Sequence, residues 1–313
     1  MTAAAAISVT GLTKRYKSRT VVDALDLELP TGVVAGLVGP NGAGKTTTMA
    51  MLLGLVRPSG GRGSVLGTPL ATPSRYLRRV GALIESPAFY PALSGAENLR
   101  TFAIAGGHDP EQVDLLIDVV GLSGRGDDRY RSYSLGMKQR LGIAGALLGE
   151  PELLILDEPA NGLDPEGVSE MRGLIGGLAH SGRTVLVSSH DLSELEQMCD
   201  WLVLIDKGRC AFAGPTSELL DGSTTGLLAA PPRTQDLPAL QDLLIRAGHH
   251  VSLHPEHVVI DVACATVAGS DVADLAARVN QIAFEAGIVL SQLSPVRSSL
   301  EDRYLNLIKG TSS

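Results

Sequence analysis

The sequence contains no uninterrupted apolar stretch of about 18 residues, the length that a membrane-spanning helix needs. It has only three cysteines, Cys199, Cys210 and Cys264, and neither their odd number nor their spacing fits a disulfide framework or a common metal site. We therefore expect reduced thiols, as in cytosolic proteins. No basic segment precedes the short apolar run of residues 1–9, so we expect no signal peptide. If the chain works at a membrane, another chain must supply the passage.

Basic residues do not dominate the chain either. It has 26 Lys and Arg against 34 Asp and Glu, a net charge of −8. This balance argues against a broad basic face, and we expect no nucleic-acid partner. The 313 residues, 44% of them hydrophobic, are enough for a full α/β domain and a smaller second domain.

Apolar strands alternate with helical segments over the first two-thirds of the chain. Strands are predicted at residues 25–29, 33–38, 153–156, 184–188 and 201–205, within or after a β-rich stretch over residues 7–38. Asp109-Pro110-Glu111 and Asp164-Pro165-Glu166 each have the residue types that begin a helix. The stretch of about 85–150 is helical in character. Strands that alternate with helices predict a parallel sheet.

A domain boundary is expected where Gly, Ser, Thr and a Pro pair gather. The sequence predicts a large domain over residues 1–222, a linker over residues 223–232, and a small α+β domain with an antiparallel sheet over residues 233–313. In the small domain, helices are expected at residues 237–247, 272–286 and 299–308, and strands at residues 251–262 and 288–293.

One short stretch carries the strongest chemical signal, Gly39-Pro40-Asn41-Gly42-Ala43-Gly44-Lys45-Thr46. Glycines let backbone N–H groups close around an anion, and the helix that follows adds the positive end of its dipole. Lys45 is expected to reach the β- and γ-phosphates, and the Thr46 hydroxyl to hold Mg²⁺. With Thr47, where the next helix is expected to begin, these residues are predicted to bind a nucleotide.

Two carboxylates follow the predicted strand at residues 153–156. In phosphate-loop ATPases, an acid at the end of such a strand holds Mg²⁺, and Asp157 fits this role. Glu158 comes next and can polarise the water that attacks the γ-phosphate. After a phosphate-binding loop, this pair predicts a hydrolytic site.

The segment Tyr133-Ser134-Leu135-Gly136-Met137 lies just before that strand. Ser134 is a sound helix cap, but a serine and a glycine at a helix start also suit a γ-phosphate. The segment resembles the signature motif of ATP-binding cassette (ABC) ATPases, commonly Leu-Ser-Gly-Gly-Gln. Here the serine and the second glycine are kept, while the first glycine and the glutamine are not. The retained pair still provides the hydroxyl and the close backbone approach.

The ABC resemblance covers about residues 7–220 and extends to further positions. Asn161-Gly162-Leu163-Asp164 follows Glu158 as the D-loop does in that family. His190 stands where the family has its switch histidine, and Tyr16 matches the aromatic residue that stacks on adenine. The resemblance therefore implies a phosphate-loop ABC ATPase core, with a mixed sheet, a β subdomain and a helical subdomain at about 85–150. It implies ATP and Mg²⁺ as cofactors, with Asp164 near the nucleotide.

One position departs from the family pattern. Glu85 stands where ABC ATPases carry a glutamine that touches Mg²⁺ and the attacking water. A carboxylate can still bind Mg²⁺, although Glu85 also suits a solvated loop. The sequence around it, Ile84-Glu85-Ser86-Pro87, is similar to ATPases of bacitracin-resistance and lantibiotic-immunity exporters. This similarity implies export of antimicrobial peptides or drugs.

The resemblance also implies partners. Two copies, or one copy and a paralogous ATPase, would enclose two ATP molecules head to tail, on the cytoplasmic face of a membrane beside a permease. The C-terminal domain would stabilise the dimer or regulate it. An importer ATPase and a soluble ABC protein of translation or repair remain alternatives. The second usually has two ATPase domains or a long coiled coil, and this chain has neither pattern.

Overall fold

The computed structural model describes residues 5–85, 87–220, 224–261 and 272–297, together with residues 300, 303 and 304. The described residues form two compact units, one ending at Thr216 and the other beginning at Ser217. Each unit is described by itself.

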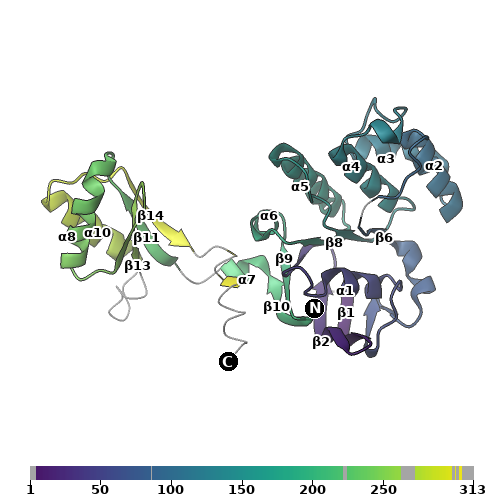
Figure 1. Cartoon of the computed structure of the whole chain (residues 1–313), viewed down its shortest axis with the longest axis horizontal. Helices are drawn as coiled ribbons and strands as arrows, with labels where there is room; N and C mark the ends of the chain where they lie inside the picture. The colour runs from purple at the N-terminus through teal and green to yellow at the C-terminus, as the bar shows by residue number, and fades with distance from the viewer. Residues whose placement is uncertain are drawn as a thin grey trace. The chain divides into compact units, whose positions relative to one another are not determined.

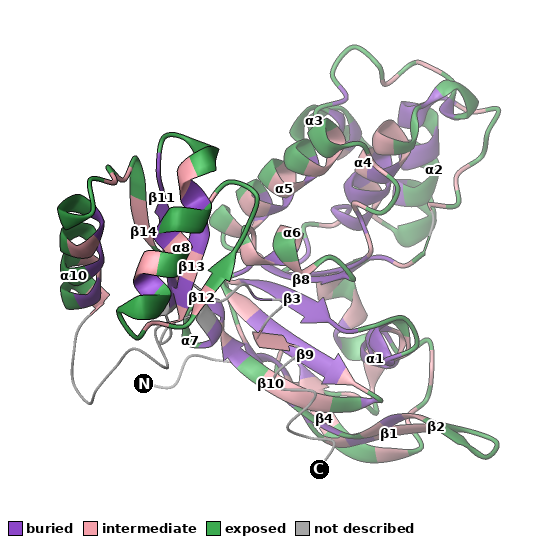
Figure 2. Ribbon diagram, turned by 60° about the vertical axis from the view of Figure 1, so that its left-hand side comes forward, coloured by how far each residue is buried: buried purple, intermediate pink, exposed green. Residues whose placement is uncertain are grey.

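A six-stranded sheet forms the centre of the first unit, with strand order β10-β9-β3-β8-β7-β6 (Figure 1). Its strands are β3 (Val34–Val38), β6 (Val80–Leu83), β7 (Leu153–Asp157), β8 (Thr184–Ser189), β9 (Trp201–Asp206) and β10 (Arg209–Pro215). All neighbours pair in parallel except β9 and β10. Every residue of β3, β7 and β8 is buried, as continuous apolar strands predict, and Figure 2 shows β3 and β8 inside the unit. The predicted parallel sheet is confirmed.

A second, antiparallel sheet has the order β2-β1-β4-β5 and forms the β subdomain. It consists of β1 (Ala5–Tyr16), β2 (Arg19–Pro30), β4 (Gly60–Val65) and β5 (Thr68–Pro69). Helix α1 (Lys45–Leu52) contributes Met49, Met51 and Leu52 to one core cluster with side chains from both sheets. Because α1 begins at the phosphate-binding loop, this packing fixes the loop against both sheets.

Three helices form the helical subdomain: α2 (Gly95–Gly106), α3 (Val113–Val119) and α4 (Leu135–Ala146). Helix α2 begins with a capping box, in which the side chains of Ser94 and Glu97 each accept from the other's backbone N–H. Helices α5 (Pro165–His180) and α6 (Leu192–Glu196) follow strands β7 and β8. The helix start expected at Asp164 is confirmed, since its side chain caps α5.

The second unit contains an antiparallel sheet of order β12-β13-β11-β14, with helices before and between its strands. Its elements are α7 (Thr216–Leu220), β11 (Thr224–Ala230), α8 (Leu237–Arg246), β12 (Val251–Leu253), β13 (Val258–Asp261), α10 (Val272–Glu285) and β14 (Gln292–Arg297). From β11 onward, the succession βαββαβ and this strand order are those of the split βαβ, ferredoxin-like arrangement. Helices α8 and α10 supply Leu240, Leu244 and Val279 to the core of this unit.

The prediction of a linker at residues 223–232 is wrong. Strand β11 occupies most of it and lies in the middle of the sheet, between β13 and β14. The small residues of this stretch are typical of a linker, but Leu227 and Ala229 alternate into the core.

Two further expectations for the small domain need correction. The strand expected at residues 251–262 is a hairpin of two short strands, because residues 254–257 turn between β12 and β13. The last strand, expected at residues 288–293, is β14 at Gln292–Arg297. The closing helix expected at residues 299–308 falls mostly outside the described residues.

Candidate nucleotide-binding site

The phosphate-binding loop connects β3 to α1, and its glycines are required by close backbone approaches. A Cβ atom on Gly39 would lie 2.3 Å from the carbonyl oxygen of Ile205. Gly44 caps α1 with φ 106°, and a Cβ atom there would lie 2.8 Å from the carbonyl oxygen of Val21. The loop therefore folds tightly between the two sheets, with the start of α1 directed at its centre.

Lys45 is the first residue of α1, and its side chain is buried at 7% exposure. Its Nζ donates to the carbonyl oxygen of Gly39 at 2.7 Å and lies 3.5 Å from Oε1 of Glu158. The ammonium group is thus held inside the loop. This is the position from which a lysine can contact a phosphate chain.

Thr46 and Asp157 meet as the sequence predicts. The Thr46 hydroxyl donates to Oδ2 of Asp157 at 2.8 Å, although the two residues come from α1 and β7. Asp157 is 5% exposed. A hydroxyl and a carboxylate are hard oxygen ligands of the kind that Mg²⁺ prefers, so the donor set fits this ion.

Glu158 follows Asp157 in a left-handed backbone conformation, with φ 49°. Its carboxylate interacts with Nδ1 of His190, which lies 2.8 Å from Oε2. The strained backbone directs the side chain away from the sheet and toward the loop that carries His190. The two residues predicted to be catalytic are therefore in direct contact.

A pocket of about 550 Å³ brings the phosphate-binding loop and these groups together. Its lining comprises Arg19, Val21, Pro40, Asn41, Gly42, Gly44, Lys45, Thr46, Thr47, Glu158, Asn161 and His190. Gly39 and Ala43 belong to the same loop. The pocket thus joins strand β2, the loop and the ends of β7 and β8.

Ser134, Gly136 and Asp164 lie elsewhere, in a second cleft of about 770 Å³. Ser134 caps α4 by accepting from the backbone N–H of Met137 at 3.2 Å, and Asp164 caps α5 by accepting from that of Gly167 at 2.9 Å. Of the residues that the structure describes, none lines both clefts. The predicted signature serine and glycine are therefore present together, but apart from the phosphate-binding loop.

Tyr16 and Glu85 are not among the lining residues of either cleft. Tyr16 lies at the end of β1, pairs with Arg19 and is 46% exposed, with Nζ of Lys14 4.8 Å from its ring centroid. Glu85 is exposed and has φ 60°. It follows β6, whose Leu83 pairs with Leu156, so its backbone lies one strand away from Asp157.

Two contributors to this site were not predicted from the sequence. Arg19 lines the pocket from β2. Ser188 is fully buried and hydrogen-bonds to both Asp157 and Glu158. The sequence signal for Ser188 was a hydroxyl at the end of an apolar strand. Its role can be inferred only once the pairing of that strand with β7 is known.

Comparison with known proteins identifies the family of this chain. Residues 22–161 match the family described as ABC transporter, and residues 233–301 match a domain of unknown function (DUF8746). The bacitracin transport ATP-binding protein BcrA of Enterococcus faecalis is 36% identical over 315 residues, which cover 97% of this chain and 96% of that protein. The chain belongs to the ABC transporter family. It is an ABC ATPase, and the resemblance seen in its sequence is confirmed.

Two other relatives of this ABC ATPase match about two-thirds of the chain. The lantibiotic transport ATP-binding protein SrtF of Streptococcus pyogenes is 40% identical over 203 residues, 65% of this chain and 88% of that protein. A solved structure of an ATP-binding subunit of an ABC transporter is 32% identical, with a TM-score of 0.61, and covers 68% of this chain and 91% of that one. Among the residues that the structure describes, no helix has both the length and the apolar character needed to cross a membrane.

Proposed function

We propose that this ABC ATPase powers the export of antimicrobial peptides or drugs through a separate membrane permease. The observation that carries the proposal is its similarity to a bacitracin transport protein over 97% of the chain, the second unit included. The similarity to a lantibiotic transport protein over 65% of the chain supports the same substrate class. The ATPase would then act on the cytoplasmic face of the membrane.

Within the site, we assign a role to each of the predicted residues. Lys45 binds the β- and γ-phosphates, and Glu158 takes a proton from the attacking water. Thr46 and Asp157 would hold Mg²⁺, which would neutralise charge on the phosphate oxygens, and Glu85 would add a further carboxylate. His190 orients Glu158, to which it is hydrogen-bonded, and contacts the γ-phosphate.

The partner is a second copy of the chain or a paralogous ATPase. The separation of the phosphate-binding pocket from the Ser134 cleft supports this part of the proposal, because the two sets of predicted nucleotide contacts lie in different clefts of one chain. In a head-to-tail pair, Ser134, Gly136 and Asp164 of one copy would close over the nucleotide of the other. Tyr16 would stack on the adenine.

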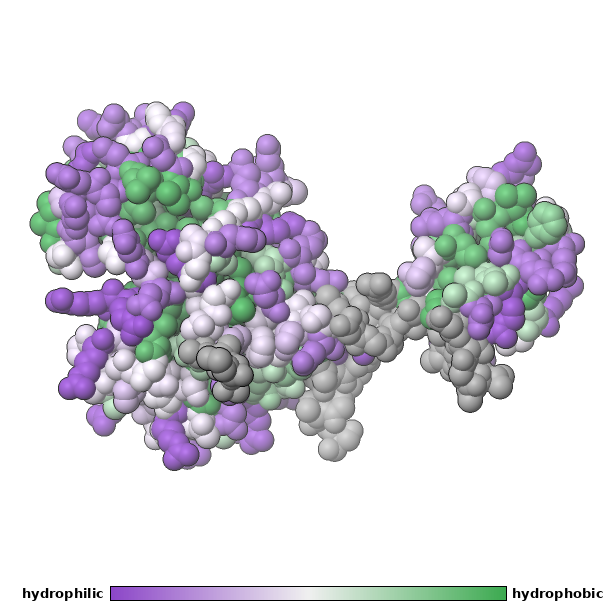
Figure 3. Space-filling view, turned by 180° about the vertical axis from the view of Figure 1, so that it is seen from behind, coloured by the Kyte–Doolittle hydropathy of each residue, from purple (hydrophilic) through white to green (hydrophobic). Residues whose placement is uncertain are grey.

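The helical subdomain is the proposed contact with the permease. Four apolar side chains of α2 and α3 are exposed: Phe102, Ile104, Leu115 and Val119. Figure 3 shows hydrophobic surface on this part of the first unit. A groove of about 460 Å³ lies close by, lined among others by Leu83, Phe89 and Phe102. Apolar surface of this kind commonly marks a protein contact.

A resistance assay tests the proposal. The chain is expressed with the membrane protein encoded beside it in a sensitive bacterial host, and inhibitory concentrations of bacitracin and a lantibiotic are measured. We expect resistance to at least one of them with the wild-type chain and none with Glu158→Gln at equal expression. If both strains are equally sensitive to every peptide while the purified wild-type protein hydrolyses ATP, the proposed substrate class is wrong.

A further inference from the structure

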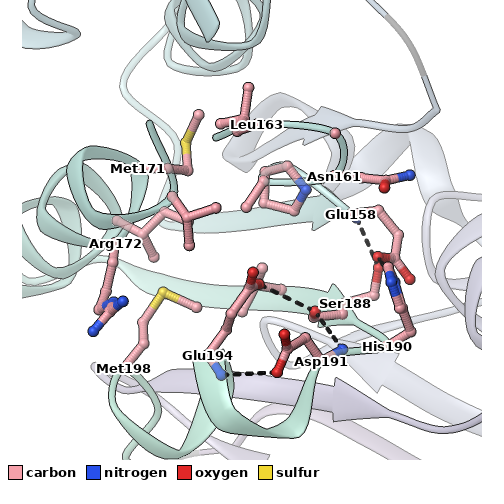
Figure 4. Close-up of a pocket in the computed structure, with 17 residues that line it drawn as sticks. Glu158, Asn161, Leu163, Met171, Arg172, Ser188, His190, Asp191, Glu194 and Met198 are labelled. Carbon is pink, nitrogen blue, oxygen red and sulfur yellow. Dashed lines mark hydrogen bonds and ion pairs between the residues drawn. The ribbon is translucent and has the colours of Figure 1, made fainter. Parts of the chain in front are cut away.

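Ser188 occupies the point where β8 ends beside the two catalytic carboxylates. Its exposure is 0%, and it pairs in register with Asp157 of the neighbouring strand β7. Figure 4 shows another pocket, beside the phosphate-binding one, in which Ser188, Glu158 and His190 lie on one side. A hydroxyl this deeply buried must find hydrogen-bond partners in the protein.

Both partners of Ser188 belong to the catalytic site. Its hydroxyl accepts from the backbone N–H of Glu158 at 2.9 Å and donates to Oδ1 of Asp157 at 2.5 Å. The direction of these bonds is fixed, since an amide N–H can only donate and an ionised carboxylate can only accept. One hydroxyl therefore joins the two carboxylate-bearing residues.

The bond to Asp157 determines how that carboxylate is presented. Ser188 holds Oδ1, while the other oxygen, Oδ2, accepts from Thr46. A donor on one oxygen fixes the carboxylate plane and leaves Oδ2 facing the helix that carries Thr46. Groups that hydrogen-bond to a metal ligand orient it in this way, and their loss typically costs about 10- to 100-fold in metal affinity or activity.

The bond to Glu158 acts on a strained segment. Glu158 has φ 49°, a conformation that a residue with a Cβ atom adopts only when its surroundings enforce it. The hydroxyl of Ser188 satisfies the backbone N–H of this residue. Without it, the amide would lack its partner, and the direction of the Glu158 side chain would be less restricted.

We propose that Ser188 is a positioning residue for ATP hydrolysis, which sets the Mg²⁺ carboxylate and the general base as one unit. It is fully buried and acts through its hydrogen bonds to Asp157 and Glu158. The inference rests on the proposed roles of these two residues. The other reading is that Ser188 only satisfies buried polar groups and stabilises the sheet.

Thr184 provides a matched control at the opposite end of the same strand. It is 2% exposed, and its hydroxyl accepts from the backbone N–H of Gly32 at 2.9 Å. Thr184→Val removes this hydrogen bond at a position away from the catalytic site. Ser188→Ala removes the hydroxyl that lies beside the catalytic site. Both variants are expected to lower the melting temperature, so the readouts that discriminate between them are kinetic.

The experiment measures ATP hydrolysis by the full chain while Mg²⁺ and ATP are varied separately. For Ser188→Ala we expect kcat to fall about 10- to 100-fold and the half-saturating Mg²⁺ concentration to rise. The KM for ATP should change less, because the phosphate-binding loop is intact. Thr184→Val should keep the wild-type kcat and Mg²⁺ requirement.

Two outcomes would overturn the inference. If Ser188→Ala matches Thr184→Val in both readouts, the role of Ser188 is only structural. If kcat falls with an unchanged Mg²⁺ requirement, the link through Asp157 is wrong. Glu158→Gln, assayed in parallel, separates this failure from that of the proposed function. If Glu158→Gln is fully active, Glu158 is not the general base, and the proposed function of the site fails independently of Ser188.

Discussion

His190 and Glu158 are hydrogen-bonded, with Nδ1 of His190 2.8 Å from Oε2 of Glu158. The other carboxylate oxygen lies 3.5 Å from Nζ of Lys45. Both partners of the Glu158 carboxylate are groups to which we assign contacts with the γ-phosphate. The Glu158 carboxylate is therefore an internal anion that interacts with Lys45 and His190. The phosphates of ATP must compete with this carboxylate for the same two side chains.

Replacing Glu158 with glutamine should separate binding from hydrolysis. Glu158→Gln removes the general base, and we expect the hydrolysis rate to fall by at least about 100-fold. ATP affinity should be retained or increased, because a neutral amide competes less well for Lys45 and His190. Phosphate release and equilibrium ATP binding measure the two effects. Turnover at the wild-type rate would contradict the assignment of Glu158 as the base.

Lys45→Ala should weaken ATP binding, in contrast to Glu158→Gln, which should lower the hydrolysis rate. The ammonium group is 7% exposed inside the phosphate-binding loop, where an interaction with a phosphate is poorly screened by water. We expect ATP affinity to fall by at least about 10-fold, measured by equilibrium titration. Arg100→Ala is the control, since this exposed cation pairs with Asp114 on the helical subdomain. Equal affinities for the two variants would exclude a phosphate contact for Lys45.

The parts of the fold that were predicted correctly are those whose signal is contiguous in the sequence. The phosphate-binding loop, the Asp157-Glu158 pair and the buried strand before it each depend on neighbouring residues. Strand β4 was not predicted, because Gly60–Val65 contains three glycines and one arginine among its six residues. It is stabilised by pairing with β1, which is about 50 residues away in the chain.

The role of Ser188 could not be predicted for a related reason. Its meaning depends on the register of β8 against β7, which places it opposite Asp157. Nothing in the local sequence fixes that register, because a slip of two residues would keep the same faces buried. The second cleft was inferred only through the family resemblance, since Ser134 and Asp164 are ordinary helix caps as single residues.

Glu85→Gln tests whether this exposed residue takes part in Mg²⁺ binding. An amide at position 85 removes one negative charge near Asp157, so we expect the half-saturating Mg²⁺ concentration for ATP hydrolysis to rise about 3-fold. Glu111→Gln, an exposed carboxylate at the start of the segment leading into α3, is the control. Unchanged hydrolysis and unchanged peptide resistance in Glu85→Gln would make Glu85 a simple loop acid.

Glu194 should make the stability of the protein depend on pH. It lies on α6, and burial, followed by the charge of Asp191, raises the pKa of its carboxyl above the usual value. The folded protein therefore binds this proton more tightly than the unfolded chain does. Stability is lost as the pH rises through the raised pKa.

Glu194→Gln removes this ionisation, so the variant should melt a few degrees above the wild type at pH 7. The difference should shrink as the pH falls through the raised pKa toward the ordinary pKa of a glutamate, because the folded and the unfolded wild type both become more protonated. Glu28→Gln, an exposed carboxylate on β2, should show no such convergence. Melting curves of the variants and the wild type between pH 4.5 and pH 8 measure these differences in melting temperature. Curves at intervals of roughly half a pH unit resolve the titration. A Glu194→Gln variant that is less stable than the wild type at pH 7 would mean that Glu194 gains more from Ser189, 3.4 Å away, than it loses by burial.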